Sequence, residues 1–168
     1  MVSADPASPA ALRVGQGFDL HPFSDDADRA LVLGGVLIPG APGLTGHSDA
    51  DVVAHALADA LLGAASLGDL GRYFPAEDPS WAGADSLDLL ARVSAMVDSA
   101  GMRVVNADCT VVCERPALSA HLEDMERRLG AVVRGPVSVK AKRTEGVGSL
   151  GRAEGIACLA VALLAGIA

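Results

Sequence analysis

The sequence predicts one α/β domain, an α+β sandwich in which helices cover one face of a mixed β-sheet. Strand-like segments with alternating or Val-rich patterns interleave with segments whose apolar residues recur at helical spacing. The 168 residues are enough for one sizeable core, and 51% of them are apolar. No internal repeat or shift in composition indicates a second domain.

Charge and composition exclude several classes of protein. The net charge of -8 argues against nucleic-acid binding through a basic surface. No apolar run approaches the roughly 18 residues that span a bilayer. Residues 1–10 lack the basic and apolar regions of a signal peptide. We therefore expect a cytoplasmic protein with no membrane contact, a disordered tail over residues 1–12 and one domain over 13–168. The cysteines form no CxxC pair and are expected as buried free thiols: Cys109, Cys113 and Cys158.

The first half of the chain predicts a strand, a hairpin and a helix. Residues 13–21 form the strand, in which Gly15 and Gly17 permit close approach of another backbone. Two apolar runs that meet at Gly34-Gly35 predict a hairpin. Residues 52–62 then show helical spacing, with Ser48 or Asp49 as the N-cap and an end between residues 63 and 68.

The second half begins with an irregular loop over residues 67–79, typical of a connector or a ligand-facing segment. The elements expected after it are a helix over 87–97 capped by 84–86, a strand over 102–113, a helix from 117 or 118 to 129, a strand over 137–142, a glycine-rich loop over 144–152 and an Ala/Leu-rich helix over 153–165.

Three residues suggest a metal site. Asp19 and His21 project from the same face of the first strand, although such a pair alone is also common at a solvated strand end. His55 lies about two turns into the first long helix. Together they offer two imidazoles and one carboxylate, which leaves a position open for water or substrate. His47 precedes the same helix, where the backbone dipole favours an anion such as phosphate.

Four motifs in order extend this interpretation to a family. They are residues 15–21 (GQGFDLH), 47–55 (HSDADVVAH), 68–71 (GDLG) with Phe74-Pro75, and 151–155 (GRAEG). Together they closely resemble the 2-C-methyl-D-erythritol 2,4-cyclodiphosphate synthase family of the non-mevalonate isoprenoid pathway. The resemblance covers nearly everything from Arg13 onward.

The resemblance implies an intramolecular phosphoryl transfer. In this family the 2-phosphate of a cytidine diphosphate-linked methylerythritol attacks the β-phosphorus, closes a cyclic diphosphate and expels CMP. By the same resemblance, Asp19, His21 and His55 would bind Zn²⁺, with a β-phosphate oxygen as fourth ligand. Glu145 would hold Mg²⁺ or Mn²⁺ between the α- and β-phosphates. These cations would neutralise the negative charge of the substrate's phosphates, which an acidic chain cannot do by itself.

The resemblance also assigns the remaining site residues. Catalysis would involve His47, Arg143 and Glu145. Residues 113–119 would form the cytosine pocket, mainly through backbone groups, and residues 74–78 would cover the erythritol portion. Substrate binding would fall to Asp19, His21, His47, Ser48, Asp69, Gly71, Phe74, Asp78, Cys113, Pro116, Ser119, Lys142, Thr144 and Arg152.

Two positions depart from the family pattern. Arg143 stands where members usually carry Thr, and Ala117 replaces a common lysine, a loss of charge that Lys142 could offset. The resemblance further implies a homotrimer with sheets packed around a threefold axis and active sites between subunits. Arg152 and Glu154 would lie near that axis, where some relatives hold an isoprenoid diphosphate. Their other interpretation is a buried or interfacial ion pair.

Two other functions are compatible with these residues. One is a zinc phosphoesterase that uses metal-bound hydroxide on a different nucleotide diphosphate. The other is a non-catalytic, metal-binding trimer that has lost the reaction through Arg143 and Ala117. The synthase is favoured because Glu145, His47 and Asp69 all accompany the zinc ligands.

Overall fold

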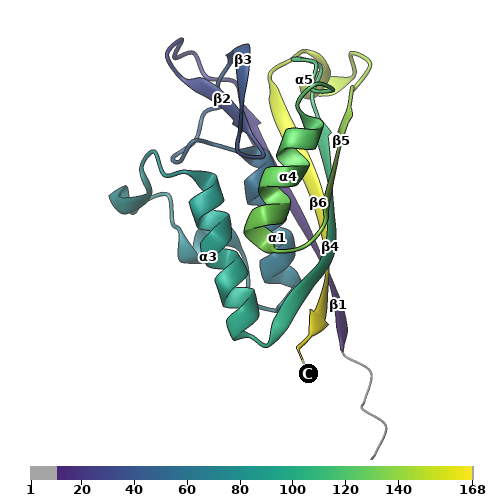
Figure 1. Cartoon of the computed structure of the whole chain (residues 1–168). Coiled ribbons are helices and arrows are strands. Elements are labelled where there is room, and N and C mark those ends of the chain that lie inside the picture. The colour runs from purple at the N-terminus through teal and green to yellow at the C-terminus, as the bar shows by residue number, and fades with distance from the viewer. Residues whose placement is uncertain (1–10, 168) are drawn as a thin grey trace, which may run out of the picture.

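The computed structural model describes residues 11–167, and they form a mixed four-stranded sheet (Figure 1). Its strand order is β1 (Leu12–Pro22), β6 (Gly155–Gly166), β4 (Met102–Val112) and β5 (Val137–Lys142). β6 runs antiparallel to both of its neighbours, whereas β4 and β5 are parallel. The predicted single α/β domain with a mixed sheet is confirmed.

The long helices cover one face of this sheet (Figure 1). They are α1 (Val52–Ala64), α3 (Ser86–Ser99) and α4 (Leu122–Val133), and α4 makes the crossover between the parallel strands. Shorter elements are α2 (Leu70–Tyr73), a 3-10 turn η1 (Pro79–Trp81) and α5 (Gly148–Gly151). None of the helices in residues 11–167 is long and apolar enough to cross a membrane.

A separate hairpin of β2 (Ala30–Leu33) and β3 (Val36–Pro42) confirms the turn predicted at Gly34-Gly35. Both glycines have positive φ, 57° and 72°, which is the conformation that a tight two-residue turn requires.

The helix expected over residues 153–165 is wrong, because this segment is the strand β6. It pairs with β1 from Leu12 opposite Ala165 to Pro22 opposite Gly155, and with β4 on its other edge. Alanine and leucine favour helices in isolation. A strand in the middle of a sheet, however, carries apolar residues on both faces and loses the alternation that identifies a strand. Its two sets of ladder hydrogen bonds override the local preference.

Four further details also differ from expectation. The N-cap of α1 is Asp51 rather than Ser48 or Asp49. The helix α4 begins at Leu122, because residues 118–121 form a turn in which His121 N donates to Leu118 O over 2.9 Å. The predicted loop over 144–152 contains α5. Of the tail expected over residues 1–12, the first ten lie outside the described residues, and β1 already begins at Leu12.

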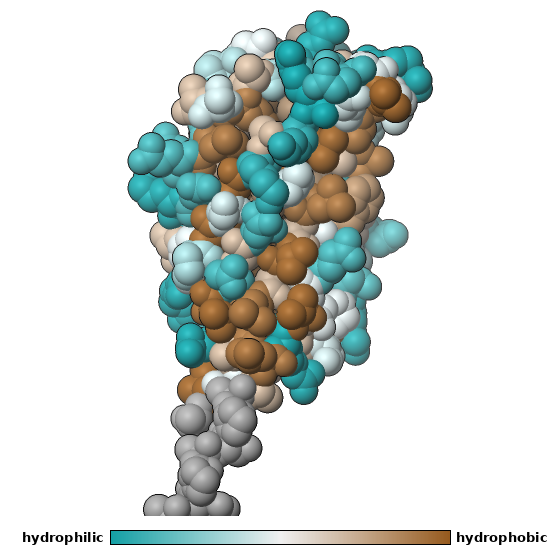
Figure 2. Space-filling model, turned by 90° about the vertical axis from the view of Figure 1, so that its right-hand side faces the viewer, coloured by the Kyte–Doolittle hydropathy of each residue, from teal (hydrophilic) through white to brown (hydrophobic). Residues whose placement is uncertain are grey.

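The two faces of the sheet differ in character. Toward the helices lies the core, which includes Cys109, Cys113 and Cys158 as the predicted free thiols. The opposite face carries apolar side chains that are 39% to 69% exposed in this chain: Val14, Phe18, Leu20, Leu159 and Val161. Figure 2, which looks onto this side of the molecule, shows a large brown area over it.

Candidate metal centre and substrate pocket

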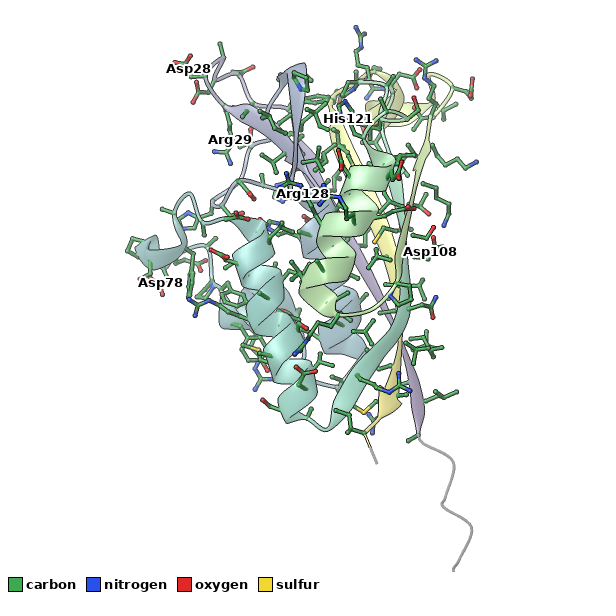
Figure 3. The ribbon with its side chains drawn as sticks, in the orientation of Figure 1. Asp28, Arg29, Asp78, Asp108, His121 and Arg128 are labelled. Atoms are coloured by element: carbon green, nitrogen blue, oxygen red, sulfur yellow. The ribbon has the colours of Figure 1, made fainter. Side chains whose placement is uncertain are left out.

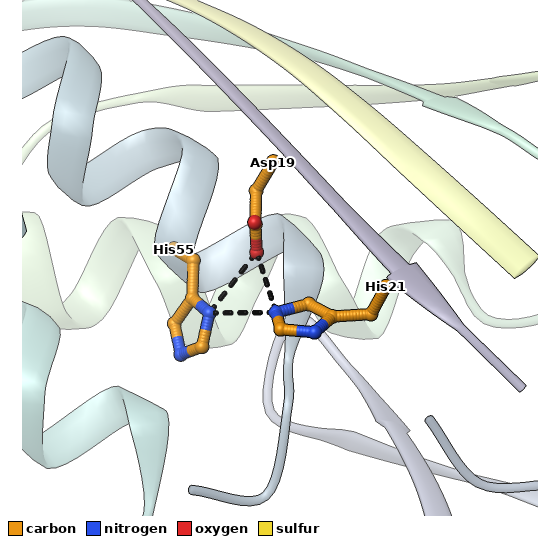
Figure 4. Close-up of side chains that lie close together, drawn as sticks. All are labelled: Asp19, His21 and His55. Atoms are coloured by element: carbon orange, nitrogen blue, oxygen red, sulfur yellow. Dashed lines mark hydrogen bonds and ion pairs between the residues drawn. The ribbon is translucent and has the colours of Figure 1, made fainter. Parts of the chain in front are cut away.

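Asp19, His21 and His55 come together beside the first turns of α1 (Figure 4). β1 supplies Asp19 and His21 from one face, and α1 supplies His55. Asp19 Oδ2 lies 3.0 Å from His21 Nε2 and 3.0 Å from His55 Nδ1, and the two ring nitrogens are 3.4 Å apart. The structure therefore unites the three residues that the sequence proposed as metal ligands.

This cluster fits a divalent cation. Ligand atoms held about 2.0–2.1 Å from a tetrahedral zinc ion lie roughly 3.3 Å from one another. The observed separations of 3.0 to 3.4 Å are close to that value. The ring of His21 is fixed from behind, because its Nδ1 lies 2.8 Å from the carbonyl oxygen of Thr45, which can only accept. In the neutral ring, Nε2 therefore presents a lone pair to the cluster.

The electrostatics of the cluster favour added positive charge. Burial alone would raise the pKa of Asp19, but its hydrogen bonds to His21 and His55 and their charges lower that pKa far below the ordinary value. Burial alone would lower the pKa of His21, but the Asp19 carboxylate raises it above the ordinary value. Without a metal, a proton on the His21 ring takes the place of the cation.

A pocket of about 160 Å³ opens beside the cluster. It brings His21 and His55 together with His47, Ser48 and Phe74, the residues expected to hold the phosphate and erythritol groups. Its remaining lining residues are Leu70, Ala76, Trp81 and Leu89.

The wall of this pocket is partly aromatic and partly loop backbone. Phe74 and Trp81 meet edge to face with ring centroids 5.0 Å apart. The backbone carbonyl of Asp78, on the loop labelled in Figure 3, lies 3.0 Å from His47 Nε2. On the other side, Arg29 donates to the carbonyl oxygens of Gly46 and Ser48 and so holds the segment that carries His47. The pocket is thus built by contacts between distant parts of the chain.

Comparison with known proteins identifies the family. A family model described as the YgbB family matches residues 12–165. The chain belongs to the YgbB family. A relative from Cyanothece sp., named 2-C-methyl-D-erythritol 2,4-cyclodiphosphate synthase, is 52% identical over 161 residues, which cover 94% of this chain and 99% of the relative.

Solved structures of similar proteins agree with this assignment. The bifunctional IspDF of Campylobacter jejuni has a TM-score of 0.89 and 37% identity over 94% of this chain, which spans 43% of that longer chain. The IspF of Plasmodium falciparum, solved as a CDP complex, has a TM-score of 0.81 and 28% identity, and the match covers 96% of this chain and all of that one.

Asp69 and Gly71, which the YgbB resemblance assigns to substrate, lie on α2 next to the pocket. Asp69 caps this short helix by accepting from Arg72 N over 3.0 Å, and its side chain is exposed. Leu70 between them lines the pocket, and its backbone N donates to Asp59 over 2.7 Å. The helix is therefore anchored to α1, while Asp69 at its cap and Gly71 face solvent.

A second group of predicted site residues gathers at the ends of β4 and β5. Cys113 N donates to Lys142 O over 3.1 Å, and the Cys113 thiol lies 3.6 Å from Pro116 O. Thr144 donates through both its hydroxyl and its backbone N to the Glu114 carboxylate. Four of its members are exposed: Ser119, Lys142, Arg143 and Glu145. Among residues 11–167, no hydrogen bond joins this group to the Asp19 cluster, and none of its members lines the pocket beside that cluster.

Arg152 and Glu154 lie on the same side as the second group. Arg152 Nε donates to Glu154 over 2.6 Å, and both side chains are more than half exposed in this chain. Arg152 also borders a pocket of about 340 Å³ together with Arg115 and Pro116.

Sequence reasoning missed several residues that contact the predicted site residues or line the pocket: Thr45, Asp49, Ser86, Trp81 and Glu114. Asp49 was considered only as a helix cap, and Ser86 only as part of the cap of α3. Trp81, the one tryptophan of the chain, lies just after the predicted irregular loop over 67–79 and was assigned to no element. Glu114 lies within the predicted cytosine pocket of residues 113–119, but it was given no role of its own.

Proposed function

We propose that this chain is a 2-C-methyl-D-erythritol 2,4-cyclodiphosphate synthase, a CMP-forming phosphorus–oxygen lyase of the non-mevalonate isoprenoid pathway. Its substrate is 4-diphosphocytidyl-2-C-methyl-D-erythritol 2-phosphate. The cluster of Asp19, His21 and His55 beside a pocket that contains His47 and Ser48 carries this proposal. Family membership and the relatives' shared name support it.

The reaction is internal to the substrate. An oxygen of the 2-phosphate forms a bond to the β-phosphorus, and the bond from that phosphorus to the α–β bridging oxygen breaks. The bridging oxygen keeps the electron pair and leaves as part of CMP, so no water is consumed. The protein must align the two phosphates and offset their charge.

Asp19, His21 and His55 would hold zinc, and Glu145 would hold magnesium or manganese. Bound there, the cations supply positive charge to the phosphoryl oxygens. His47 and Ser48, at the end of α1 that favours anions, would orient the methylerythritol phosphate and stabilise its charge in the transition state. Phe74 and the segment to Asp78 would cover the apolar side of the erythritol.

The nucleotide would bind the second group of residues. Backbone groups of residues 113–119, including Cys113, Pro116 and Ser119, would take the cytosine. Lys142, Arg143 and Thr144 would contact the diphosphate, with Arg143 offering charge and two donors where a hydroxyl is usual. The CDP complex of the Plasmodium falciparum relative supports nucleotide binding in this fold.

We further propose a homotrimer with sheets around a threefold axis. The exposed apolar sheet face supports an interface there. The separation of the two site groups within one chain supports an active site shared between subunits. Arg152 and Glu154 would face the axis and an isoprenoid diphosphate, and a thermal melt with geranyl diphosphate tests this. No shift at saturating ligand would leave the pair as an interfacial ion pair.

The decisive experiment is phosphorus NMR of the protein with zinc, magnesium and the substrate. Cyclic diphosphate and CMP are the expected products, and a sample with chelator is the control. Incorporation of oxygen from labelled water would instead indicate the phosphoesterase. Intact substrate despite bound zinc would indicate the non-catalytic trimer, and the Arg143→Thr variant would then show whether this residue blocks the reaction.

A further inference from the structure

We propose that Asp49 and Ser86 are positioning residues for the metal centre. Through their hydrogen bonds they keep the ring proton of His55 on Nε2, which leaves Nδ1 free to bind a divalent cation. The inference rests on the metal site of the proposed function, but not on the cyclisation itself.

The contacts form a chain behind His55. Ser86, the first residue of α3, is 1% exposed, and its Oγ lies 2.9 Å from His55 Nε2. The Ser86 hydroxyl donates to the Asp49 carboxylate, and Ser86 N also donates to that carboxylate over 3.2 Å. Asp49 is itself held by Asp51 N, which donates to it over 3.1 Å.

Counting protons along this chain fixes the ring. A hydroxyl has one proton, and a carboxylate can only accept, so the Ser86 hydroxyl donates its proton to Asp49 and has none left for His55. The Ser86 oxygen then presents lone pairs to His55, and Nε2 has to be the donor across the 2.9 Å contact. A neutral imidazole has a single N–H, so Nδ1 presents its lone pair toward Asp19 and His21. Three lone pairs thus converge where a cation would bind.

Ser48 offers the competing arrangement. Its Oγ lies 3.2 Å from His55 Nε2 and 3.3 Å from Ser86 Oγ. A proton donated by Ser48 to Nε2 would move the ring proton to Nδ1, where it would bond Asp19 and have to be displaced by any metal. That arrangement would set the lone pairs of Ser86 Oγ and Nε2 against each other at 2.9 Å. In the other tautomer the Nδ1 lone pair lies 3.0 Å from the Asp19 carboxylate, and a proton on His21 Nε2, 3.4 Å from Nδ1, or a cation between the three groups offsets that repulsion. Asp49, by orienting the Ser86 hydroxyl, therefore selects the metal-binding tautomer.

The two imidazoles differ in how they are oriented. His21 bonds a backbone carbonyl, that of Thr45, which no side-chain substitution removes. His55 depends on two side chains, so its orientation is open to mutation. Carboxylates and hydroxyls behind a ligating histidine typically contribute 10- to 100-fold in metal affinity.

The test compares Ser86→Ala and Asp49→Asn with Ser94→Ala. Ser94 is the matched control, since it lies on the same helix and is 3% exposed, and its hydroxyl accepts from Arg134 over 3.4 Å. Zinc affinity is measured by competition with a chelator. We expect about 10- to 100-fold weaker binding in the first two variants and no change in the control. Ser86→Thr keeps the hydroxyl and should retain most of the affinity.

A second measurement reports the tautomer directly. Long-range proton–nitrogen NMR of the metal-free protein should show the proton of His55 on Nε2 in the wild type and a shift toward Nδ1 in Ser86→Ala. Urea denaturation confirms that each variant is folded. If Asp49→Asn does not fold, Ser86→Ala alone still tests the proposal, because it keeps the bond from the backbone N of residue 86 to Asp49. A proton on Nδ1 in the wild type, or zinc affinity of Ser86→Ala within twofold of the wild type, would overturn the proposal. Both readouts are independent of turnover, so a wild type that binds zinc without cyclising its substrate would defeat only the proposed function.

Discussion

Gly17 sets the distance between β1 and α1, and therefore between the two halves of the metal centre. A Cβ placed on Gly17 would lie 2.7 Å from Ala60 N and closer still to Ala56 O, both of which are backbone atoms that cannot rotate away. Ordinary contact begins at 3.4 Å, so Gly17→Ala must separate the strand and the helix by at least 0.7 Å. Overpacking of this kind usually costs about 1–3 kcal/mol, and with two backbone atoms opposed we expect about 3 kcal/mol.

The separation should also weaken the metal centre. β1 carries Asp19 and His21 while α1 carries His55, and metal ligands tolerate errors of only about 0.2 Å. Gly17→Ala should therefore lose at least about tenfold in zinc affinity by chelator competition, as well as stability in urea.

Gly63→Ala is the matched control. Gly63 lies on α1, its nearest neighbour is Gln16 O at 3.8 Å, and alanine there should stabilise by about 0.5–1 kcal/mol. Equal unfolding free energies for Gly17→Ala and the wild type would refute this account of the packing.

Three further outcomes are expected. Asp51→Asn should lower the free energy of unfolding in urea by about 2–3 kcal/mol. The carboxylate accepts from four backbone N–H groups at α1 and the β2–β3 turn, and an amide would turn a donor toward one of them. A loss below about 1 kcal/mol would contradict this. In metal-free protein, Asp19 raises the pKa of His21, so their mutual stabilisation is present below about pH 6.5 and is lost as the pH rises through the raised value. Melting temperatures in chelator should therefore fall as the pH rises above about 6.5, and a flat profile would count against the pairing. Burial and the charge of Glu114 raise the pKa of Cys113. Mass spectrometry should therefore find slow alkylation of this thiol at neutral pH and faster alkylation above the ordinary thiol pKa of about 8.5. Rapid labelling at neutral pH would show that the thiol is not shielded.

The fold was predictable wherever a pattern is local. The hairpin at Gly34-Gly35 needs only its two glycines, and the helix α3 needs only its cap and apolar stripe. β6 was not predictable in this way, because a strand buried between β1 and β4 shows Ala, Leu and Val on both faces and has no local feature that distinguishes it from a buried helix. The start of α4 was missed since the turn at Leu118 is set by its burial in the core rather than by a capping residue.

The residues of the site also fall into those that a local pattern predicts and those that only tertiary contacts define. Asp19, His21 and His55 could be proposed from strand and helix periodicity together with the family resemblance. Their supporting partners could not, because Ser86 contacts His55 across 31 positions and Thr45 contacts His21 across 24. Such contacts depend on the docking of α3 and of the loop before α1, and no spacing in the sequence encodes them.

The segment Ser48 to Asp51 shows why cap and site cannot be separated in this protein. Asp51 accepts from the first turn of α1 and from the turn of the β2–β3 hairpin, and so joins two elements at the base of the pocket. Asp49 accepts from Ser86 and joins α3 to the same segment. Ser48 faces His55. Because neighbouring residues fix the hairpin, α1 and α3 around one imidazole, the metal centre reaches its geometry only when all three elements are docked. A cation that binds this geometry must therefore stabilise their docking by the same free energy that the docking contributes to its affinity.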